Sequence, residues 1–240
     1  MKRGESTLRV LIAGVYLVDK PSHINEITCE FGRSQGIQVE QRWVALGQGD
    51  IPSILRPITA LRSTMPEEKF ILINKVLQND YEGFDYIVIC DDDIVLPAEF
   101  LPSFLRLVER HGFALSQPAR SHDSFIDHHF VEQLDGLSAR QTRFVEIGPT
   151  FCVRQDAFGL LLPFDESAKM GWGLDFIWPL LIEDANLTAG IVDATTVKHN
   201  LRPPVSHYSY DETAQAMREY LAGRPHLTKS DAFRIIESYA

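Results

Sequence analysis

The chain has 240 residues, of which 45% are hydrophobic and 23% are charged, and its formal net charge is −10. This length and composition predict one large α/β domain, or one such domain with a small appendage, with enough apolar residues to bury a core. The negative charge argues against sequence-independent binding of nucleic acid, which requires a basic surface.

The N-terminal segment and the cysteines indicate the cellular setting. The apolar run from Val10 to Val18 holds only nine residues, too few for a membrane span, and no clear cleavage site follows it. We therefore expect a first strand rather than a signal peptide. Cys29, Cys90 and Cys152 are scattered, which predicts neither a disulfide framework nor a zinc site. A reducing, cytoplasmic compartment is the expected location.

The first half of the chain predicts alternating strands and helices. A strand over residues 8–17 is followed by a short helix over 22–31, a strand over 37–46 and a turn-rich loop over 47–57. The sequence Thr64-Met65-Pro66-Glu67 resembles a capping box and predicts a helix that ends near Gln78. A strand over 86–90 and a helix over 97–111, ended by Gly112, come next.

The second half predicts the same alternation around one long loop. Strands are predicted at 113–117, 144–153 and 190–197, and helices at 155–162, after the glycine-rich turn at 171–173, at 210–221 and at 230–239. Residues 119–143 are polar and irregular, and a loop of this length in a compact domain is usually functional or mobile. The expected fold is α/β, with a mostly parallel central sheet flanked by helices. Residues 1–205 would form the catalytic domain, and 206–240 a C-terminal helical appendage.

Three consecutive carboxylates, Asp91, Asp92 and Asp93, follow the apolar run Tyr86 to Cys90. Such a run is typical of a strand buried on both faces of a parallel sheet, and ligands of open α/β sheets bind outside the carboxyl ends of the strands. Asp91 and Asp93 can point to the same side. Carboxylate oxygens suit a hard cation such as Mg²⁺ or Mn²⁺, which also binds substrate phosphates. The alternative is a solvated acidic turn.

His199 closely follows the last predicted strand and precedes Arg202. If that strand lies inside the sheet, His199 emerges at the same edge as the acids and is a candidate third metal ligand. The alternative is a surface histidine. Arg202 is a candidate for binding a diphosphate, and Lys69, on the helix before the acidic strand, is a second one; each of them is otherwise a solvated charge.

The segment Gly171-Trp172-Gly173-Leu174-Asp175 opens a predicted helix. Gly173 permits a close approach to a ligand, and Trp172 is either a core residue or a platform that stacks on a sugar. Asp175 has two interpretations, a cap of the helix or a general base held at a cleft. In the long loop, His122, His128 and His129 do not match a zinc pattern and either line an acceptor pocket or have no role.

In their order along the chain, these motifs resemble the GT-A glycosyltransferase superfamily, and they are especially similar to a plant and bacterial family within it whose function is unknown. The segments that carry the resemblance are Lys69 to Lys75, Tyr86 to Asp93, Leu115 to Pro118, Phe144 to Glu146, Trp172 to Asp175 and Gly190 to His199. The resemblance covers roughly residues 65 to 205.

The resemblance implies roles for individual residues. Asp91 would lie near the nucleotide ribose and the metal, and Asp93 and His199 would bind Mn²⁺ or Mg²⁺. Asp175 would match the acid that deprotonates the acceptor hydroxyl in inverting members. Asp92, Lys69, Gln117, His129, Trp172, Gly173 and Arg202 are the candidate substrate-binding residues.

The function implied is metal-dependent transfer of a sugar from a nucleotide-diphosphate-sugar to a hydroxyl acceptor, with no nucleic acid and no membrane span involved. Two alternatives stay open. One is a nucleotidyl- or phosphoryl-transfer enzyme that uses the same acids, although no P-loop sequence is present. The other is a protein that binds a sugar nucleotide without turnover.

Overall fold

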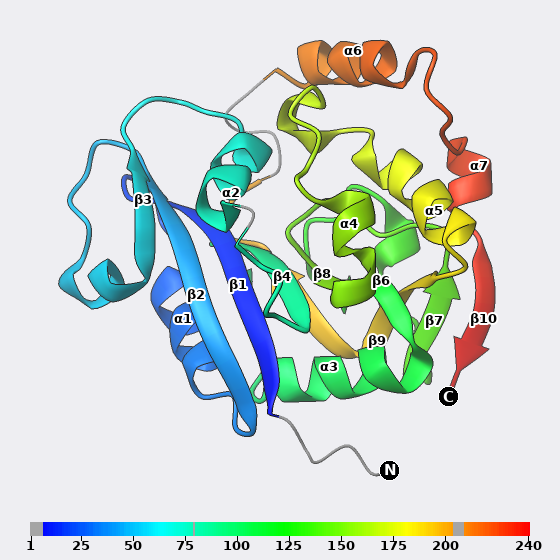
Figure 1. The fold of residues 1–240 in the computed structure, drawn as a ribbon, viewed down its shortest axis with the longest axis horizontal. Coiled ribbons are helices and arrows are strands. Elements are labelled where there is room, and N and C mark those ends of the chain that lie inside the picture. Colours follow the sequence, from blue (N-terminus) through cyan, green and yellow to red (C-terminus); the bar gives the residue numbers. More distant parts are fainter. Residues whose placement is uncertain (1–6, 79, 204–208) are drawn as a thin grey trace.

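A single mixed sheet runs through the computed structural model, which describes residues 7–78, 80–203 and 209–240 (Figure 1). The strand order is β10-β7-β9-β6-β8-β4-β1-β2-β3, and the short β5 pairs with β9. The strands are β1 (Leu8–Leu17), β2 (Ile37–Leu46), β3 (Thr59–Ser63), β4 (Tyr86–Asp91), β5 (Ile94–Val95), β6 (Phe113–Arg120), β7 (Ala139–Thr142), β8 (Thr150–Arg154), β9 (Thr188–His199) and β10 (Ile235–Tyr239). The helices are α1 (Ile24–Gly32), α2 (Lys69–Leu77), α3 (Phe100–His111), α4 (Phe158–Leu161), α5 (Leu174–Asp184), α6 (Tyr210–Leu221) and α7 (Lys229–Ala232).

Parallel pairing forms the core of the sheet. β3, β2, β1 and β4 are parallel neighbours, and β6 is parallel to β9. β8 lies antiparallel between β4 and β6, and β7 and β10 add antiparallel strands at the far edge. The expected α/β class, with a central sheet flanked by helices, is confirmed.

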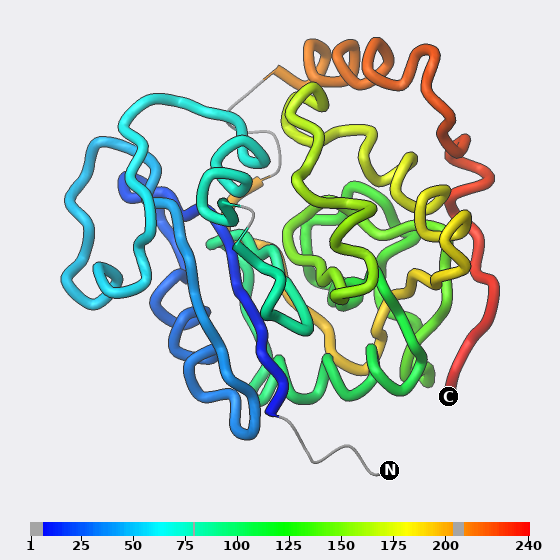
Figure 2. The backbone as a smooth tube through the Cα atoms, in the orientation of Figure 1, coloured from blue at the N-terminus to red at the C-terminus, as the bar shows by residue number. Residues whose placement is uncertain are grey.

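The side chains of β1 show how the sheet is covered on both faces. Leu11 and Ala13 pack in the cluster that contains α2, α4 and α5. Val10 and Ile12 point the other way, into the cluster that contains α1 and α3. Because successive residues of a strand face opposite sides, a strand buried on both faces needs a continuous apolar run. Figure 2 shows the chain winding from one of these helical layers to the other.

Several predicted elements differ from the structure. The helix predicted over 230–239 is wrong: α7 is short, and Ile235–Tyr239 forms β10, which pairs with β7. Its isoleucines and tyrosine favour a strand, and most of the segment is exposed, so no buried helix face exists there. β7 lies within the predicted loop 119–143. The strand predicted over 144–153 begins only at Thr150, after the cis bond between Gly148 and Pro149.

The predicted capping box is also wrong. α2 begins at Lys69, its N-cap residue is Glu68, and no side chain caps it. The segment before it is instead held in a turn, where Ser63 donates a hydrogen bond to the carbonyl of Met65 and Gln48 donates to that of Thr64. The helix ends at Leu77, and its C-cap residue, Gln78, lies in the left-handed region.

Other expectations fall on described residues only in part. Cys90 and Cys152 are buried, and all three cysteines are free. In the described ranges we find no helix with the length and hydropathy that a membrane crossing needs. Residues 1–6 and the predicted domain boundary between residues 205 and 206 lie outside the described residues.

Candidate active site

A cavity of about 1330 Å³ opens at the carboxyl ends of β1 and β4, beside the end of β9. The acidic triplet, Lys69, His199 and Arg202 line it, and so does Asp175. The triplet reaches the cavity because β4 ends at Asp91. The two residues of β5 then pair with the end of β9, where Ile94 is opposite His199. This pairing places His199 beside Asp93.

Asp93 and His199 are in direct contact. His199 Nε2 lies 3.1 Å from Asp93 Oδ2, and the Arg202 guanidinium lies 3.1 Å from the same oxygen. Burial raises the pKa of Asp93, but the hydrogen bond from His199 and the charges of Arg202 and Lys69 outweigh it, so the pKa is below its ordinary value. Asp93 is therefore a carboxylate at neutral pH.

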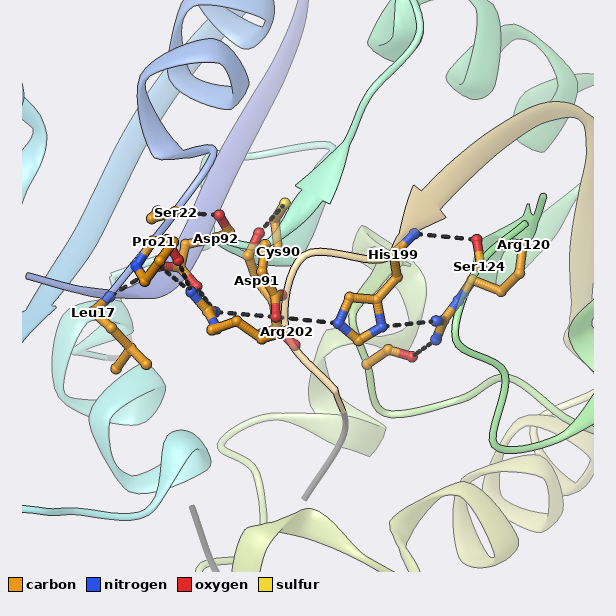
Figure 3. A network of polar contacts seen from close by, with 12 residues as sticks. Leu17, Pro21, Ser22, Cys90, Asp91, Asp92, Arg120, Ser124, His199 and Arg202 are labelled. Atoms are coloured by element: carbon orange, nitrogen blue, oxygen red, sulfur yellow. Dashed lines mark hydrogen bonds and ion pairs between the residues drawn. The ribbon is translucent and has the colours of Figure 1, made fainter. Parts of the chain in front are cut away.

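His199 is held on several sides. Its backbone N–H donates to Ser124 Oγ, and its carbonyl accepts from Phe125. On the ring, Arg120 Nη1 lies 3.4 Å from Nδ1 (Figure 3). Because arginine has donors only, Nδ1 accepts this bond, and Nε2 carries the proton that points to Asp93. Coordination of a metal by Nε2 requires that proton to leave.

Arg120 is in turn anchored by two further bonds. Its Nη2 donates to Glu146 Oε2 at 2.7 Å and to the carbonyl of Gly148 at 2.6 Å. Burial raises the pKa of Glu146 to about 7, and the charge of Arg120 offsets this only in part. Both side chains are almost fully buried. The chain of contacts thus joins Asp93 to Glu146 through His199 and Arg120.

Asp92 and Arg202 bind each other. The two side chains form an ion pair, Asp92 Oδ2 accepts from the backbone N–H of Leu17, and Arg202 donates to the carbonyl of Pro21. Asp92 is 2% exposed. Burial raises its pKa although Arg202 acts in the opposite direction. This ion pair links the segment after β9 to the end of β1, so its role in this structure is to hold these two segments together.

Asp91 pairs with Lys69. Lys69 Nζ lies 2.6 Å from Asp91 Oδ1. The backbone N–H of Asp91 donates to the carbonyl of Pro149, so the start of the triplet is fixed to the loop before β8. Among the described residues, the three aspartates form ion pairs with two full positive charges, those of Lys69 and Arg202.

The side chains of Asp93 and His199 are of types that bind a divalent cation, but their arrangement does not form a complete metal site. A carboxylate and an imidazole converge at Asp93 and His199, and Mn²⁺ accepts both. Across the described ranges, no three His, Cys, Asp or Glu side chains are grouped so that they could hold a metal ion. The ion pair between Asp91 and Lys69 would have to break before Asp91 could coordinate the cation.

Asp175 lies in the first turn of α5 and lines the same cavity. The N-cap residue of α5 is Gly173, at φ 101°, and no side chain caps the helix. Asp175 Oδ1 is buried without a hydrogen-bond partner. Burial raises the pKa of Asp175 to about 7, although nearby backbone N–H groups lower it in part. A carboxyl group with this pKa can take up a proton near neutral pH.

Trp172 and Gly173 also line the cavity. The ring of Trp172 is half-buried and meets that of Tyr210 edge to face at 5.3 Å. Trp178, in contrast, is a core residue. A Cβ atom at Gly173 would approach the ring of Tyr220 at 3.1 Å, so the glycine is explained by packing as well as by its backbone angle.

Two predicted site residues do not line the cavity. Gln117 is 1% exposed, and its side-chain oxygen accepts from the backbone N–H of Glu146 at 2.5 Å, so it positions the loop below the site. His129 is exposed and pairs with Glu132, whereas its neighbour His128 lines the cavity. Arg120 and Glu146 have no equivalent in the predicted site. Glu146 lies in the segment Phe144 to Glu146, which carries part of the resemblance, whereas Arg120 has no sequence signal.

Comparison with known proteins supports the fold. No protein-family model matches the chain, and no curated protein sequence matches it. Among solved structures, GalNAc-T7 with UDP, GalNAc and Mn²⁺ is 10% identical, with a TM-score of 0.59 over 90% of this chain and 48% of that one. TarS 1-349 from S. aureus in complex with UDP-GlcNAc is 11% identical, with a TM-score of 0.60 over 90% of this chain and 66% of that one. A second structure of TarS 1-349 is 12% identical, with a TM-score of 0.54 over 89% and 70%.

These similarities establish the fold alone. The chain spans about half of the GalNAc-T7 chain and two thirds of the TarS complex chain. At such low identity, a shared fold does not determine the reaction. The chain has a GT-A-like fold, which resembles that of nucleotide-sugar glycosyltransferases.

Proposed function

We propose that the protein is a metal-dependent glycosyltransferase that moves a sugar from a nucleotide-diphosphate-sugar to a hydroxyl acceptor. The observation that carries the proposal is that Asp93 and His199 converge at the carboxyl end of β4 and face the same cavity as Asp175. The similar fold of GalNAc-T7, solved with UDP and Mn²⁺, supports it.

Asp93, His199 and Asp91 would hold Mn²⁺ or Mg²⁺ together with the donor diphosphate. When bound, the cation would stabilise the negative charge of the leaving nucleotide. Lys69, whose Nζ lies 2.6 Å from Asp91 Oδ1, would turn from Asp91 to a phosphate oxygen. Because Lys69 and Arg202 already compensate most of the triplet's charge, we expect the free protein to bind the cation weakly and the donor to strengthen this binding.

Asp175 would act as the general base. The acceptor oxygen attacks the anomeric carbon and forms the new C–O bond, while the bond from that carbon to the diphosphate oxygen breaks and its electron pair leaves with the nucleotide. The acceptor proton passes to Asp175. A base is most effective when its pKa lies near the working pH, and the pKa of about 7 at Asp175 meets this condition. This direct displacement inverts the anomeric centre.

Trp172 and Gly173 border the space in front of Asp175. We assign Trp172 as a stacking surface for a sugar ring and Gly173 as the residue that lets the ring approach the start of α5. Asp92 and Arg202 would act mainly through their ion pair, which holds the segment after β9 against the end of β1. Gln117 would act indirectly, because its side chain holds the backbone of Glu146. We assign no substrate contact to His129.

A thermal-shift panel tests this function. UDP-, GDP-, CMP- and TDP-sugars are each added with Mn²⁺, with Mg²⁺ and with EDTA, to the wild type and to Asp93→Ala. A ligand that binds only the folded state raises its melting temperature. We expect one of the nucleoside-diphosphate classes (UDP, GDP or TDP) to stabilise the wild type in a metal-dependent way and to leave Asp93→Ala unchanged. If no donor stabilises the protein, or if EDTA has no effect, the proposal fails.

A further inference from the structure

Every methionine among the described residues lines one cavity. Met65, Met170 and Met217 come from the loop before α2, from the turn before α5 and from α6, and all three border the cavity of the candidate active site. Trp172 and Tyr210 border it as well. We call these five residues the apolar rim. Segments far apart in the sequence thus bring apolar residues to the same cavity.

The apolar rim is accessible to solvent. Met65 is 69% exposed and Tyr210 is 61% exposed, while Met170, Met217 and Trp172 are half-buried. A single exposed apolar side chain is normal on a protein surface, but a group of them at a cavity marks a binding surface. Methionine suits such a surface because its unbranched, polarizable side chain adapts to different apolar ligands.

The backbone at Met170 gives a second, independent observation. Met170 has a φ of 56°, in the left-handed region that a non-glycine residue adopts only at an energetic cost. The next residue, Gly171, has no room for a side chain, because a Cβ atom there would lie 2.0 Å from the ring of Phe70. Packing against Phe70 therefore imposes a turn that keeps Met170 at the cavity.

The cavity lining contains buried polar atoms. Asp175 Oδ1 and His128 Nδ1 are buried without hydrogen-bond partners, and both residues line the cavity. Buried polar groups require partners, so a ligand that carries hydroxyl groups would complete these two. The cavity thus combines two buried polar atoms without partners with a group of apolar side chains that are exposed or half-buried.

We propose that the acceptor is amphipathic: a hydroxyl-bearing polar head that enters toward Asp175, bonded to a hydrocarbon portion that lies against the apolar rim. This inference rests on the proposed function, because it identifies the class of acceptor for the same site. A wholly polar acceptor would leave the exposed side chains of the rim in water, whereas an alkyl or aryl group removes that surface from water.

The experiment compares n-octyl β-glucoside with methyl β-glucoside, which share the sugar and differ in the hydrocarbon chain. Dissociation constants are measured by calorimetry below the concentration at which micelles form. We expect the octyl compound to bind the wild type at least about tenfold more tightly, because burial of two methylene groups contributes enough free energy for a difference of that size. Equal affinities, or no binding of the octyl compound, would overturn the proposal.

Two variants test whether the apolar rim is responsible. In Met65→Ser/Tyr210→Ser, both replaced side chains are largely exposed, so the fold is not at risk. Met170→Gly removes a side chain and suits the left-handed backbone. We expect the preference for the octyl compound to fall to about threefold or less in each. Ile54→Ser is the matched control, because Ile54 is 72% exposed and lies outside the cavity lining, and it should keep the full preference.

A preference that persists in both rim variants would place the octyl chain elsewhere and refute the assignment. Metal-dependent stabilisation by the donor is measured on the same preparations. If that stabilisation is present while the octyl preference is absent, only the acceptor class is wrong. If it is absent, the proposed function fails whatever the glucosides do.

Discussion

Replacing Asp175 by asparagine should change how the stability of the protein depends on pH. The side chain is 7% exposed, and burial raises its pKa from 3.8 to about 7. Between these values the folded protein binds a proton that the unfolded chain has released. The free energy of unfolding of the wild type therefore falls as the pH rises through this window, and Asp175→Asn removes that contribution.

The size of the effect follows from the two pKa values. One pKa unit corresponds to about 1.4 kcal/mol, so the whole window is worth about 4 kcal/mol. Between about pH 5 and about pH 8, linkage gives a loss of about 3 kcal/mol that is due to Asp175. The difference in unfolding free energy between the variant and the wild type should therefore shift by this amount in favour of the variant.

Urea denaturation of both proteins at these two pH values measures that shift. Asp184→Asn is the control, because Asp184 is the exposed last residue of the same helix and burial cannot produce a comparable slope there. If wild type and Asp175→Asn lose stability in parallel as the pH rises, Asp175 is not the buried proton-binding group described above, and its assignment as a base with a pKa near 7 loses its basis.

The remaining predictions concern the site and the sheet. Asp93→Ala should keep the fold, judged by circular dichroism, but lose the tightening of Mn²⁺ binding by the donor; normal binding would refute the metal assignment. Arg202→Met should lower the free energy of unfolding by about 3 kcal/mol because it leaves Asp92 buried without its partner, and adding Asp92→Asn should recover part of this in denaturant titrations. Gly14→Ala should cost at least about 2 kcal/mol, since its Cβ would lie 2.2 Å from the carbonyl oxygen of Cys90; a stable variant would contradict the close pairing of β1 with β4.

The parts of the fold that could be predicted from sequence are those with a continuous signal. β4 is an apolar run that ends in acidic residues. Because ligands bind at the carboxyl ends of such strands, its position at the cavity could be predicted. β1 and β2 were predicted with the bounds that the structure shows. The α6 helix was also predicted correctly over Tyr210–Leu221.

The rest depended on tertiary contacts that leave no local pattern. β5 has two residues, too few for a periodic signal, yet its pairing with β9 brings Asp93 to His199. Arg120 was unremarkable in sequence, because only the extension of β6 to its full length sets the guanidinium beside His199. Asp92 was expected to bind substrate, but which acid of the triplet turns inward is decided by Arg202 and the end of β1.

Release of nucleoside diphosphate from a sugar donor tests the central claim most directly. The donor class that stabilises the protein is incubated with an acceptor mixture and Mn²⁺, and the free nucleoside diphosphate is quantified for the wild type, Asp93→Ala and Asp175→Asn. We expect release by the wild type that stops with EDTA, that is lost in Asp93→Ala, and that in Asp175→Asn is slowed far more than donor binding is weakened. Release that is indifferent to EDTA and to Asp93→Ala, or no release from a donor that binds, would contradict a metal-dependent glycosyltransferase.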